Sequence, residues 1–312
     1  MLTIGIDVGG TLIRAAAIDS VGRILSSRRA PTPRTVDGFR EWIVHAVHHI
    51  REDSANRTVV AVGLALPGVV DRDRGVLIRS VNLSFLEGRP IVHELTPRLA
   101  TRVELCTDAD AATWGEYWAC TPRPMAFVHL RLGTGIASGI VVDNRLQPTD
   151  PDRTTHWEVL VVDHRPDAPL CPCGMRGCLE TIASGPALEG QEAEMGYENG
   201  STGLQSAWER DEPLARMIVD RSAAALVSAI CNLKSHIQDC PLPHGRGSDP
   251  TISPEIVICL GGGVLTALPC LFEQTAKRLR SFDDDFTRCV AVHPSRLGDD
   301  AGVIGAATLA RV

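Results

Sequence analysis

Three cysteines stand close together in segment 171–180, which reads CPCGMRGCLE. Cys171, Cys173 and Cys178 can supply three thiolates to a zinc ion, and a tetrahedral structural zinc site needs a fourth ligand. The rest of the chain's 10 cysteines are scattered, as is usual for small buried side chains in a reducing compartment. The cluster therefore predicts a metal site, with buried or redox cysteines that hold no metal as the alternative.

A glycine pair stands in segment 7–11, which reads DVGGT and follows a run of apolar, strand-forming residues. Gly9 and Gly10 let the backbone turn tightly and bring its N–H groups close to phosphate oxygens, and Thr11 can add a hydroxyl donor. Asp7 beside such a turn could hold Mg²⁺ through water, because this ion keeps part of its hydration. The segment predicts a phosphate-binding hairpin, with an ordinary Gly-Gly turn as the alternative.

Two later glycine-rich segments resemble this one. Each follows an apolar strand-like run, and the second also opens a helix, where backbone amides and a flat surface suit a nucleotide. Their members are Gly133, Thr134, Gly135, Gly261, Gly262 and Gly263. Three such turns predict a nucleotide held between two lobes. Asp108 lies in the chain between the first of these turns and the cysteine segment. Together, the turns, Asp108 and the cysteine segment point to ATP-dependent phosphoryl transfer onto a small hydroxylated substrate.

The composition argues against several classes of protein. The chain has 312 residues and 44% apolar content, which suffices for one large or two medium domains. Its net charge of -7, without a dense basic run, argues against a nucleic-acid surface. No signal peptide is evident, and no apolar run approaches the ~20 residues that span a bilayer. We therefore expect a cytoplasmic protein with no nucleic-acid or membrane partner.

Strand and helix patterns place these turns at the ends of strands. Residues 2–8 and 14–19 predict an antiparallel pair, with a third strand at 23–29. Helices and strands are then expected to alternate at 39–50, 59–66, 91–99, 103–106 and 109–118. A second strand–turn–strand unit, a helical run and a last buried strand are expected at 126–132, 138–142, 212–236 and 255–260. The repeated layout predicts two similar halves.

Together these motifs resemble the ROK family (repressors, open reading frames and kinases), which has the sugar-kinase, hexokinase and actin-like ATPase fold. The matching segments run along nearly the whole chain. They are 7–11, 66–68, 70–71, 82–83, 107–112, 114–116, 132–135, 171–180, 261–263 and 298–302. The cysteine segment is the most specific of them.

The resemblance implies an α/β, two-lobed actin/hexokinase-like ATPase fold with ribonuclease H-like halves. We expect residues 1–118 with 296–312 to form the N-terminal lobe and 119–295 to form the C-terminal lobe. A Pro/Gly/Ser-rich stretch predicts an exposed insertion near 240–253. The resemblance further implies a glucokinase-like, ATP-dependent kinase for a hexose or amino-hexose, with Mg²⁺ and structural Zn²⁺, acting as a homodimer.

In that family the aspartate of an Asn-Asp pair is the catalytic base, and here the pair is Thr107-Asp108. A carboxylate at a strand end can accept the proton of a sugar hydroxyl as the hydroxyl attacks the γ-phosphate. The alternative is that Asp108 merely caps the helix expected to begin near residue 109. Thr107 can only partly replace the amide with which an Asn would hold the sugar.

The resemblance also places the fourth zinc ligand in a Glu-x-Gly-His segment, where this chain instead reads RTTHWEV. One register puts His156 on the family's His and Arg153 on its sugar-binding Glu. Counting back from the first cysteine without a gap instead puts Glu158 on that Glu and Val161 on the His. We prefer the first register because three thiolates without a fourth donor make a poor site, and His164 is a weaker candidate.

The sugar site implied by the resemblance consists of Asn82, Thr107, Asp108, His156, Glu158 and Glu180. An unpaired buried hydroxyl costs ~1–3 kcal/mol of binding, so Arg153 in place of the Glu predicts an altered sugar site. A catalytically impaired sugar- or nucleotide-binding relative is the main alternative function. A transcriptional regulator would need a helix-turn-helix ahead of the first strand. Polyphosphate is a possible donor for relatives of this kind, but the modest number of Lys and Arg residues does not indicate it.

Overall fold

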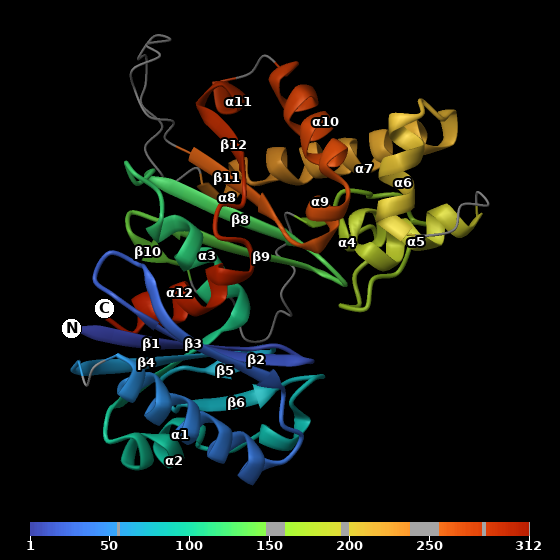
Figure 1. Ribbon diagram of the computed structural model, residues 1–312. Coiled ribbons are helices and arrows are strands. Elements are labelled where there is room, and N and C mark those ends of the chain that lie inside the picture. Colours follow the sequence, from blue (N-terminus) through green and yellow to red (C-terminus); the bar gives the residue numbers. More distant parts are fainter. Residues whose placement is uncertain (55–56, 148–159, 195–199, 238–255, 283–284, 312) are drawn as a thin grey trace. The chain divides into compact units, whose positions relative to one another are not determined.

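The computed structural model describes residues 1–54, 57–147, 160–194, 200–237, 256–282 and 285–311 (Figure 1). Two units account for the chain, each with its own five-stranded sheet. Unit 1 comprises Met1–Arg123 with Leu297–Val312, and unit 2 comprises Pro124–Arg296. In these described ranges, no helix combines the length and apolar character needed to cross a bilayer.

The sheet of unit 1 has the order β3-β2-β1-β4-β7. Its strands are β1 (Leu2–Val8), β2 (Leu12–Ile18), β3 (Ile24–Pro31), β4 (Val59–Leu66) and β7 (Arg102–Thr107). Strand β2 runs antiparallel to both β1 and β3, whereas β4 runs parallel to β1 and β7 runs parallel to β4. The central strand β1 is buried along almost its whole length, as expected for a strand covered on both faces. The edge strand β3 alternates exposed and half-buried residues.

Helices cover both faces of this sheet (Figure 1). On one face lie α1 (Val36–Asp53) and α2 (Ile91–Leu99), and on the other lie α3 (Asp108–Trp118) and α12 (Ala301–Leu309). The hairpin of β5 (Val69–Asp71) and β6 (Val76–Arg79) and the short helices η1 (Ser84–Leu86) and η3 (Gly298–Asp300) complete the unit.

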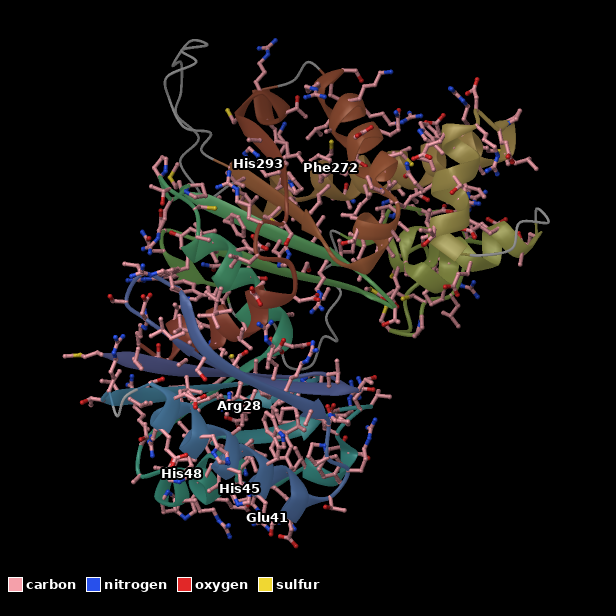
Figure 2. All side chains as sticks on the ribbon, viewed as in Figure 1. Arg28, Glu41, His45, His48, Phe272 and His293 are labelled. Carbon is pink, nitrogen blue, oxygen red and sulfur yellow. The ribbon has the colours of Figure 1, made fainter. Side chains whose placement is uncertain are left out.

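The helix α1 shows how the sequence selects its buried face. Thr35 caps its first turn by accepting a hydrogen bond from the Gly38 amide. Its buried side chains recur every three or four residues, at Phe39, Ile43, Ala46, Val47 and Ile50. Glu41, His45 and His48 lie on the exposed side (Figure 2). The amphipathic pattern thus predicts which side of the helix meets the sheet.

The helix α12 packs within unit 1 through apolar side chains such as Val303 and Ala307 and also through close backbone contacts at glycines. A Cβ atom on Gly5 of β1 would overlap the carbonyl oxygen of Val303, and one on Gly305 would overlap that of Ala111 in α3. Glycine at these positions allows the backbones of α12, β1 and α3 to approach more closely than any side chain would permit. The close approach brings the first turn of α12 beside Asp7, where a Cβ on Gly302 would overlap the carboxylate.

The sheet of unit 2 has the order β10-β9-β8-β11-β12. Its strands are β8 (Ala126–Leu132), β9 (Ile136–Val142), β10 (Arg145–Leu146), β11 (Ile256–Gly261) and β12 (Val290–Pro294). An antiparallel hairpin of β8 and β9 is extended on the other side of β8 by two parallel strands. The unit therefore repeats the hairpin-then-parallel layout of unit 1.

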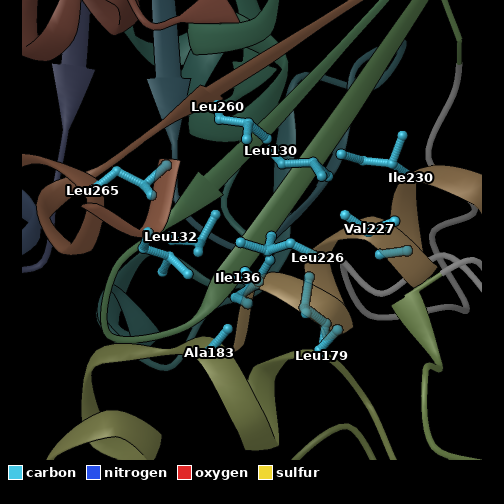
Figure 3. Packing of buried hydrophobic residues seen from close by; sticks show 14 of the residues in the cluster. Leu130, Leu132, Ile136, Leu179, Ala183, Leu226, Val227, Ile230, Leu260 and Leu265 are labelled. Carbon is cyan, nitrogen blue, oxygen red and sulfur yellow. The ribbon is translucent and has the colours of Figure 1, made fainter. Parts of the chain in front are cut away.

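The core of unit 2 lies between this sheet and α7 (Pro213–Asn232). Figure 3 shows Leu130 and Ile136 of the hairpin packed with Leu226, Val227 and Ile230 of that helix. The remaining helices are α4 (Glu180–Ala183), α5 (Gly185–Glu194), α6 (Gly200–Glu209), α8 (Lys234–Ile237), α9 (Gly263–Ala267), α10 (Pro269–Arg280) and α11 (Asp285–Cys289).

Most expected elements are confirmed to within three residues. The helix expected at 109–118 begins one residue earlier, and the helix expected at 39–50 extends by three residues at each end. The helical run expected at 212–236 is divided into α7 and α8. Helices α5 and α6 were not expected. The insertion expected near 240–253, like His156, Glu158 and Arg153, lies outside the described residues.

Candidate active site

The glycine turn of segment 7–11 joins β1 to β2, with Val8 paired to Ile13. The Gly9 amide donates to the Leu12 carbonyl oxygen at 2.8 Å and closes the turn. The Asp7 carboxylate lies against Gly302, in the first turn of α12. The N-terminal end of a helix carries a partial positive charge, and this end of α12 faces the Asp7 side chain.

Asn82 lies directly against this turn. A Cβ atom on Gly10 would lie 2.9 Å from Asn82 Cγ, so a larger residue at position 10 would require the asparagine side chain to shift. The structure thus brings a residue of the predicted sugar site next to one of the predicted phosphate site, within a single unit.

Asp108 lies at the same edge of the sheet as the 7–11 turn. Asp7 of β1 pairs with Ala65 of β4, which in turn pairs with Cys106 of β7. Adjacent strands lie about 4.8 Å apart, so Asp7 and Cys106 are separated by roughly 10 Å. Asp108 follows two residues after Cys106, as the first residue of α3. The carboxyl ends of parallel strands, where open α/β sheets bind ligands, therefore carry both acidic residues.

The capping role that was the alternative for Asp108 belongs to Thr107. The Thr107 hydroxyl oxygen accepts a hydrogen bond from the Asp110 amide at 3.0 Å. This bond satisfies one of the amides left open at the start of α3. The Thr107 hydroxyl group stands where the family has an asparagine amide. Its oxygen is thus already hydrogen-bonded to the first turn of α3.

Asp110 is a buried acidic residue of this site whose role the sequence pattern alone did not indicate. Its side chain is 5% exposed, and its Oδ1 atom has no hydrogen-bond partner among the described residues. Burial raises the pKa of the Asp110 carboxyl, while the charge of Arg72 and hydrogen bonds from Thr107 oppose the shift. The Thr-x-x-Asp spacing of a reciprocal helix cap was the available signal.

We expect Asp110→Asn to stabilise the protein at neutral pH. A carboxyl group whose folded pKa is raised favours folding below its unfolded value of about 3.8, and this contribution is lost as pH rises through the folded pKa. The neutral amide avoids the cost of a buried charge, so Tm at pH 7.5 should rise by roughly 2–4 °C, or about 1 kcal/mol. Thermal unfolding from pH 4 to pH 8 measures the difference, which should shrink toward pH 4.

A matched control for this prediction is Asp73→Asn, which changes an exposed loop carboxyl group. It should leave Tm unchanged across the same pH range. A loss of stability in Asp110→Asn that is equal at every pH would contradict the proposed effect of burial.

In unit 2, Glu180 connects the second glycine turn to the cysteine segment. Its Oε2 atom accepts from the Ile136 amide at 2.7 Å, directly after the turn at 133–135. The turn is closed by a bond from the Gly133 amide to the Gly135 carbonyl oxygen, and Gly133 accepts from the Gly185 amide. The sulfhydryl of Cys171 reaches the Oε1 atom of Glu180 at 3.8 Å. The carboxylate predicted to contact sugar thus also positions a backbone turn.

The third glycine segment lies beside the second. Gly262 has a φ of 99° and precedes α9, and a Cβ atom there would overlap the Leu132 carbonyl oxygen at the end of β8. Gly261 pairs with Arg131 in the parallel ladder of β11 and β8. Both glycine segments of unit 2 therefore meet at one edge of its sheet, as the analogous residues do in unit 1.

The three clustered cysteines form a group that could hold a metal ion. The ligand atoms of Cys171, Cys173 and Cys178 lie within 4.8 Å of one another, and the last two sulfur atoms are 3.6 Å apart. Sulfur atoms bound to one zinc at about 2.3 Å are separated by roughly 3.8 Å, so the spacing fits. Burial raises the pKa of the Cys171 thiol to about 11 in the absence of a metal. His164 is exposed and does not belong to the group found in the described part of the chain.

Comparison with known protein families identifies the family of this chain. The model of the ROK family matches residues 3–312. The chain belongs to the ROK family. This match confirms the family resemblance. The solved structures described below confirm the actin/hexokinase-like α/β fold.

Sequence relatives of this ROK-family chain include sugar kinases. The glucokinase of Thermotoga maritima is 30% identical over 311 residues, covering 98% of this chain and 96% of that protein. The N-acetylmannosamine kinase of Salmonella typhi is 29% identical, covering 100% of this chain and 99% of that protein. The glucokinase of Streptomyces coelicolor is 35% identical over 192 residues, and this match spans 60% of the chain and 57% of that protein.

Solved structures of the ROK family show the same fold. The ROK hexokinase of Thermus thermophilus superposes with a TM-score of 0.78 and 27% identity, covering 100% of this chain and 98% of that one. The ROK glucokinase of Streptomyces griseus, in complex with glucose and AMPPNP, superposes with a TM-score of 0.72 and 27% identity. That match covers 100% of this chain and 99% of that one.

Proposed function

We propose that this ROK-family chain is an ATP-dependent sugar kinase that phosphorylates a hydroxyl group of a hexose or amino-hexose. The observation that carries the proposal is the row of strand ends in unit 1, where the 7–11 turn and Asp108 share one sheet edge. The full-length similarity to the glucokinase of T. maritima and the N-acetylmannosamine kinase of S. typhi supports the same activity. The AMPPNP complex of the S. griseus glucokinase supports ATP as the donor.

Asp108 is the proposed general base. Its carboxylate would accept the proton of the sugar hydroxyl while the hydroxyl oxygen forms a bond to the γ-phosphorus and the bond from that phosphorus to the β-phosphate bridging oxygen breaks. The products are ADP, a sugar phosphate and the proton. Such a base contributes most when it is held rigidly, and Asp108 is held by its place in the first turn of α3.

The phosphate groups are assigned to backbone amides. In unit 1 these come from Gly10 and Thr11, because the Gly9 amide is donated to the Leu12 carbonyl oxygen and serves to close the turn. In unit 2 they come from the turns at 133–135 and 261–263, where Gly133 has the same turn-closing role as Gly9. The proposed donors of unit 2 are Thr134, Gly135, Gly261, Gly262 and Gly263. Asp7 would hold Mg²⁺ through water, since carboxylate oxygen is a ligand type this ion prefers. The ion would neutralise charge on the transferred phosphoryl group.

Asn82, Thr107 and Glu180 are proposed to contact the sugar, with His156 and Glu158 as further members by resemblance. The hydroxyl group of Thr107 accepts a bond from the Asp110 amide, so it offers less to a sugar than an asparagine amide would. A lost hydrogen bond to a sugar hydroxyl costs ~1–3 kcal/mol, which is a factor of roughly 5–150 in affinity. We therefore propose that the preferred sugar differs from glucose.

The three cysteines are proposed as ligands of a structural Zn²⁺. Their sulfur spacing supports this assignment, and His156 is the proposed fourth ligand. The cluster precedes Glu180, which accepts from the Ile136 amide, so the metal would stabilise the segment that holds the second glycine turn.

Replacing one ligand tests the zinc site. Cys178→Ser should reduce the zinc content from about one ion per chain to far below one and lower the free energy of unfolding by roughly 2–4 kcal/mol, because the metal binds only the folded form. Elemental analysis and thermal unfolding measure both effects. Cys231→Ser, in α7 of the same unit, is the control and should keep its zinc. The assignment would be rejected if the wild-type protein contained no zinc and its Tm were the same with and without added zinc.

A coupled ADP-release screen tests the proposed activity. Glucose, N-acetylglucosamine, N-acetylmannosamine, allose and fructose are offered in turn with ATP. The best of them is then offered with polyphosphate, and formation of the sugar phosphate is measured directly because this donor releases no ADP. Sugar-dependent ADP release supports the kinase. Sugar binding by calorimetry without any ADP release would instead identify a catalytically impaired relative.

A further inference from the structure

The segment between β3 and α1 braces the outer side of the 7–11 turn. The Thr32 hydroxyl donates to the Gly9 carbonyl oxygen at 2.7 Å, and the Thr32 amide donates to the Thr11 carbonyl oxygen at 2.8 Å. Thr32 itself is buried, with 4% of its surface exposed. The turn is therefore fixed by a neighbouring segment as well as by its own strands.

Arg34 completes this brace and extends it to the sugar-binding segment. Its Nη2 atom donates to the Gly10 carbonyl oxygen at 2.6 Å, and its Nη1 atom donates to the Asn82 carbonyl oxygen at 3.3 Å. Gly10 and Asn82 are also neighbours, since a Cβ atom on Gly10 would lie 2.9 Å from Asn82 Cγ. One guanidinium group thus spans two carbonyl groups that come from segments 72 positions apart in the chain.

No carboxylate neutralises this arginine among the residues that the structure describes. The ion pairs of the described residues do not include Arg34, and its hydrogen bonds to Gly10 and Asn82 both go to backbone oxygen. Charge-assisted hydrogen bonds are roughly twice as strong as neutral ones, so the guanidinium is an effective clamp for two peptide groups.

The orientation of the Gly10–Thr11 peptide follows from this clamp. In a trans peptide the C=O and N–H groups point in opposite directions. Since the Gly10 carbonyl oxygen points to Arg34, the Thr11 N–H points away from it. No described residue accepts a hydrogen bond from that amide. The clamp therefore leaves an open N–H group on the side of the turn opposite Arg34.

We propose that Arg34 is a positioning residue, which orients the Gly10–Thr11 peptide for a nucleotide phosphate and couples it to the sugar-binding segment at Asn82 without touching either ligand. This inference rests on the proposed kinase function. Lysine cannot replace arginine here, because a single ammonium nitrogen lacks the planar fork that reaches both carbonyl groups.

The test compares Arg34→Ala and Arg34→Lys with Arg29→Ala, which removes an exposed positive charge from β3. Arg34→Ala should raise KM for both ATP and the sugar about 10-fold and lower kcat, with Tm within about 2 °C of wild type. It should also abolish any effect of saturating sugar on the affinity for AMPPNP. Arg34→Lys should recover less than half of the lost kcat/KM, and Arg29→Ala should behave as wild type.

Two results would overturn the inference while leaving the kinase function intact. One is kinetic constants of Arg34→Ala equal to those of Arg29→Ala. The other is full recovery in Arg34→Lys, which would show that charge alone matters. If the wild type phosphorylates no sugar, the proposed function fails, and AMPPNP titration still decides the inference. Equal affinity in wild type and Arg34→Ala then overturns it, and a 10-fold loss supports it.

Discussion

Asp108→Asn should lower kcat by roughly 10²–10⁴-fold while leaving the protein folded. The substitution preserves the size of the side chain but removes its capacity to accept a proton, and general-base catalysis is worth about that factor. Asp108 is the first residue of α3, but the helix is capped by Thr107, whose hydroxyl oxygen accepts a hydrogen bond from the Asp110 amide. Tm should therefore change little, and KM for ATP should stay within a few-fold.

The measurement is steady-state ADP release with the best sugar from the screen. Asp110→Asn is a comparison in the same helix, two residues away, with the same chemical change. It should retain turnover within a few-fold and alter stability instead. Turnover by Asp108→Asn that matches wild type would remove Asp108 from the role of base.

Gly305→Ala should strongly destabilise unit 1, although it adds only one methyl group. The added Cβ atom would overlap the Ala111 carbonyl oxygen of α3, and neither backbone can move without disturbing the sheet beneath α12. Overpacking of a core costs typically 1–3 kcal/mol, and a clash between two backbones belongs at or above the upper limit. We expect a loss of about 3 kcal/mol or more in the free energy of unfolding.

Gly190→Ala is the matched control for this substitution. Gly190 also lies inside a helix, α5, but no atom lies within 4 Å of the Cβ position there. Because alanine favours a helix over glycine by roughly 0.5–1 kcal/mol, this variant should be as stable as wild type or more so. Urea unfolding of both variants provides the comparison, and equal stabilities would show that α12 can shift at little cost.

Local sequence patterns predict much of this fold. Glycine pairs placed directly after apolar runs predict both strand–turn–strand units, and the pairing of Val8 with Ile13 closes the first as expected. The helix α1 is predicted by buried residues that recur at helical spacing. In contrast, α5 reads GPALEGQEAE, with few apolar residues, a glycine as its first residue and another inside it, and this helix packs with other helices of unit 2.

The parts of the site that the sequence could not reveal depend on contacts between distant segments. Nothing near Glu180 indicates that it accepts a hydrogen bond from Ile136, 44 positions away. Likewise, nothing in the sequence near Asp110 indicates that the charge of Arg72, 38 positions away, acts on its buried carboxyl group. Arg34 resembles many other surface arginines when only the sequence is read. The roles of the site residues in binding and catalysis stay predictions.

The use of α12 to cover the first sheet has a consequence for biosynthesis. Strands β1 and β4 leave the ribosome early, yet the helix that covers one of their faces comes from residues 301–309. All of Pro124–Arg296 emerges in between and can fold first. The glycine-lined face of the first sheet therefore stays uncovered until α12 has been synthesised. Nascent chains that are halted before residue 301 should be targets for chaperones and proteases.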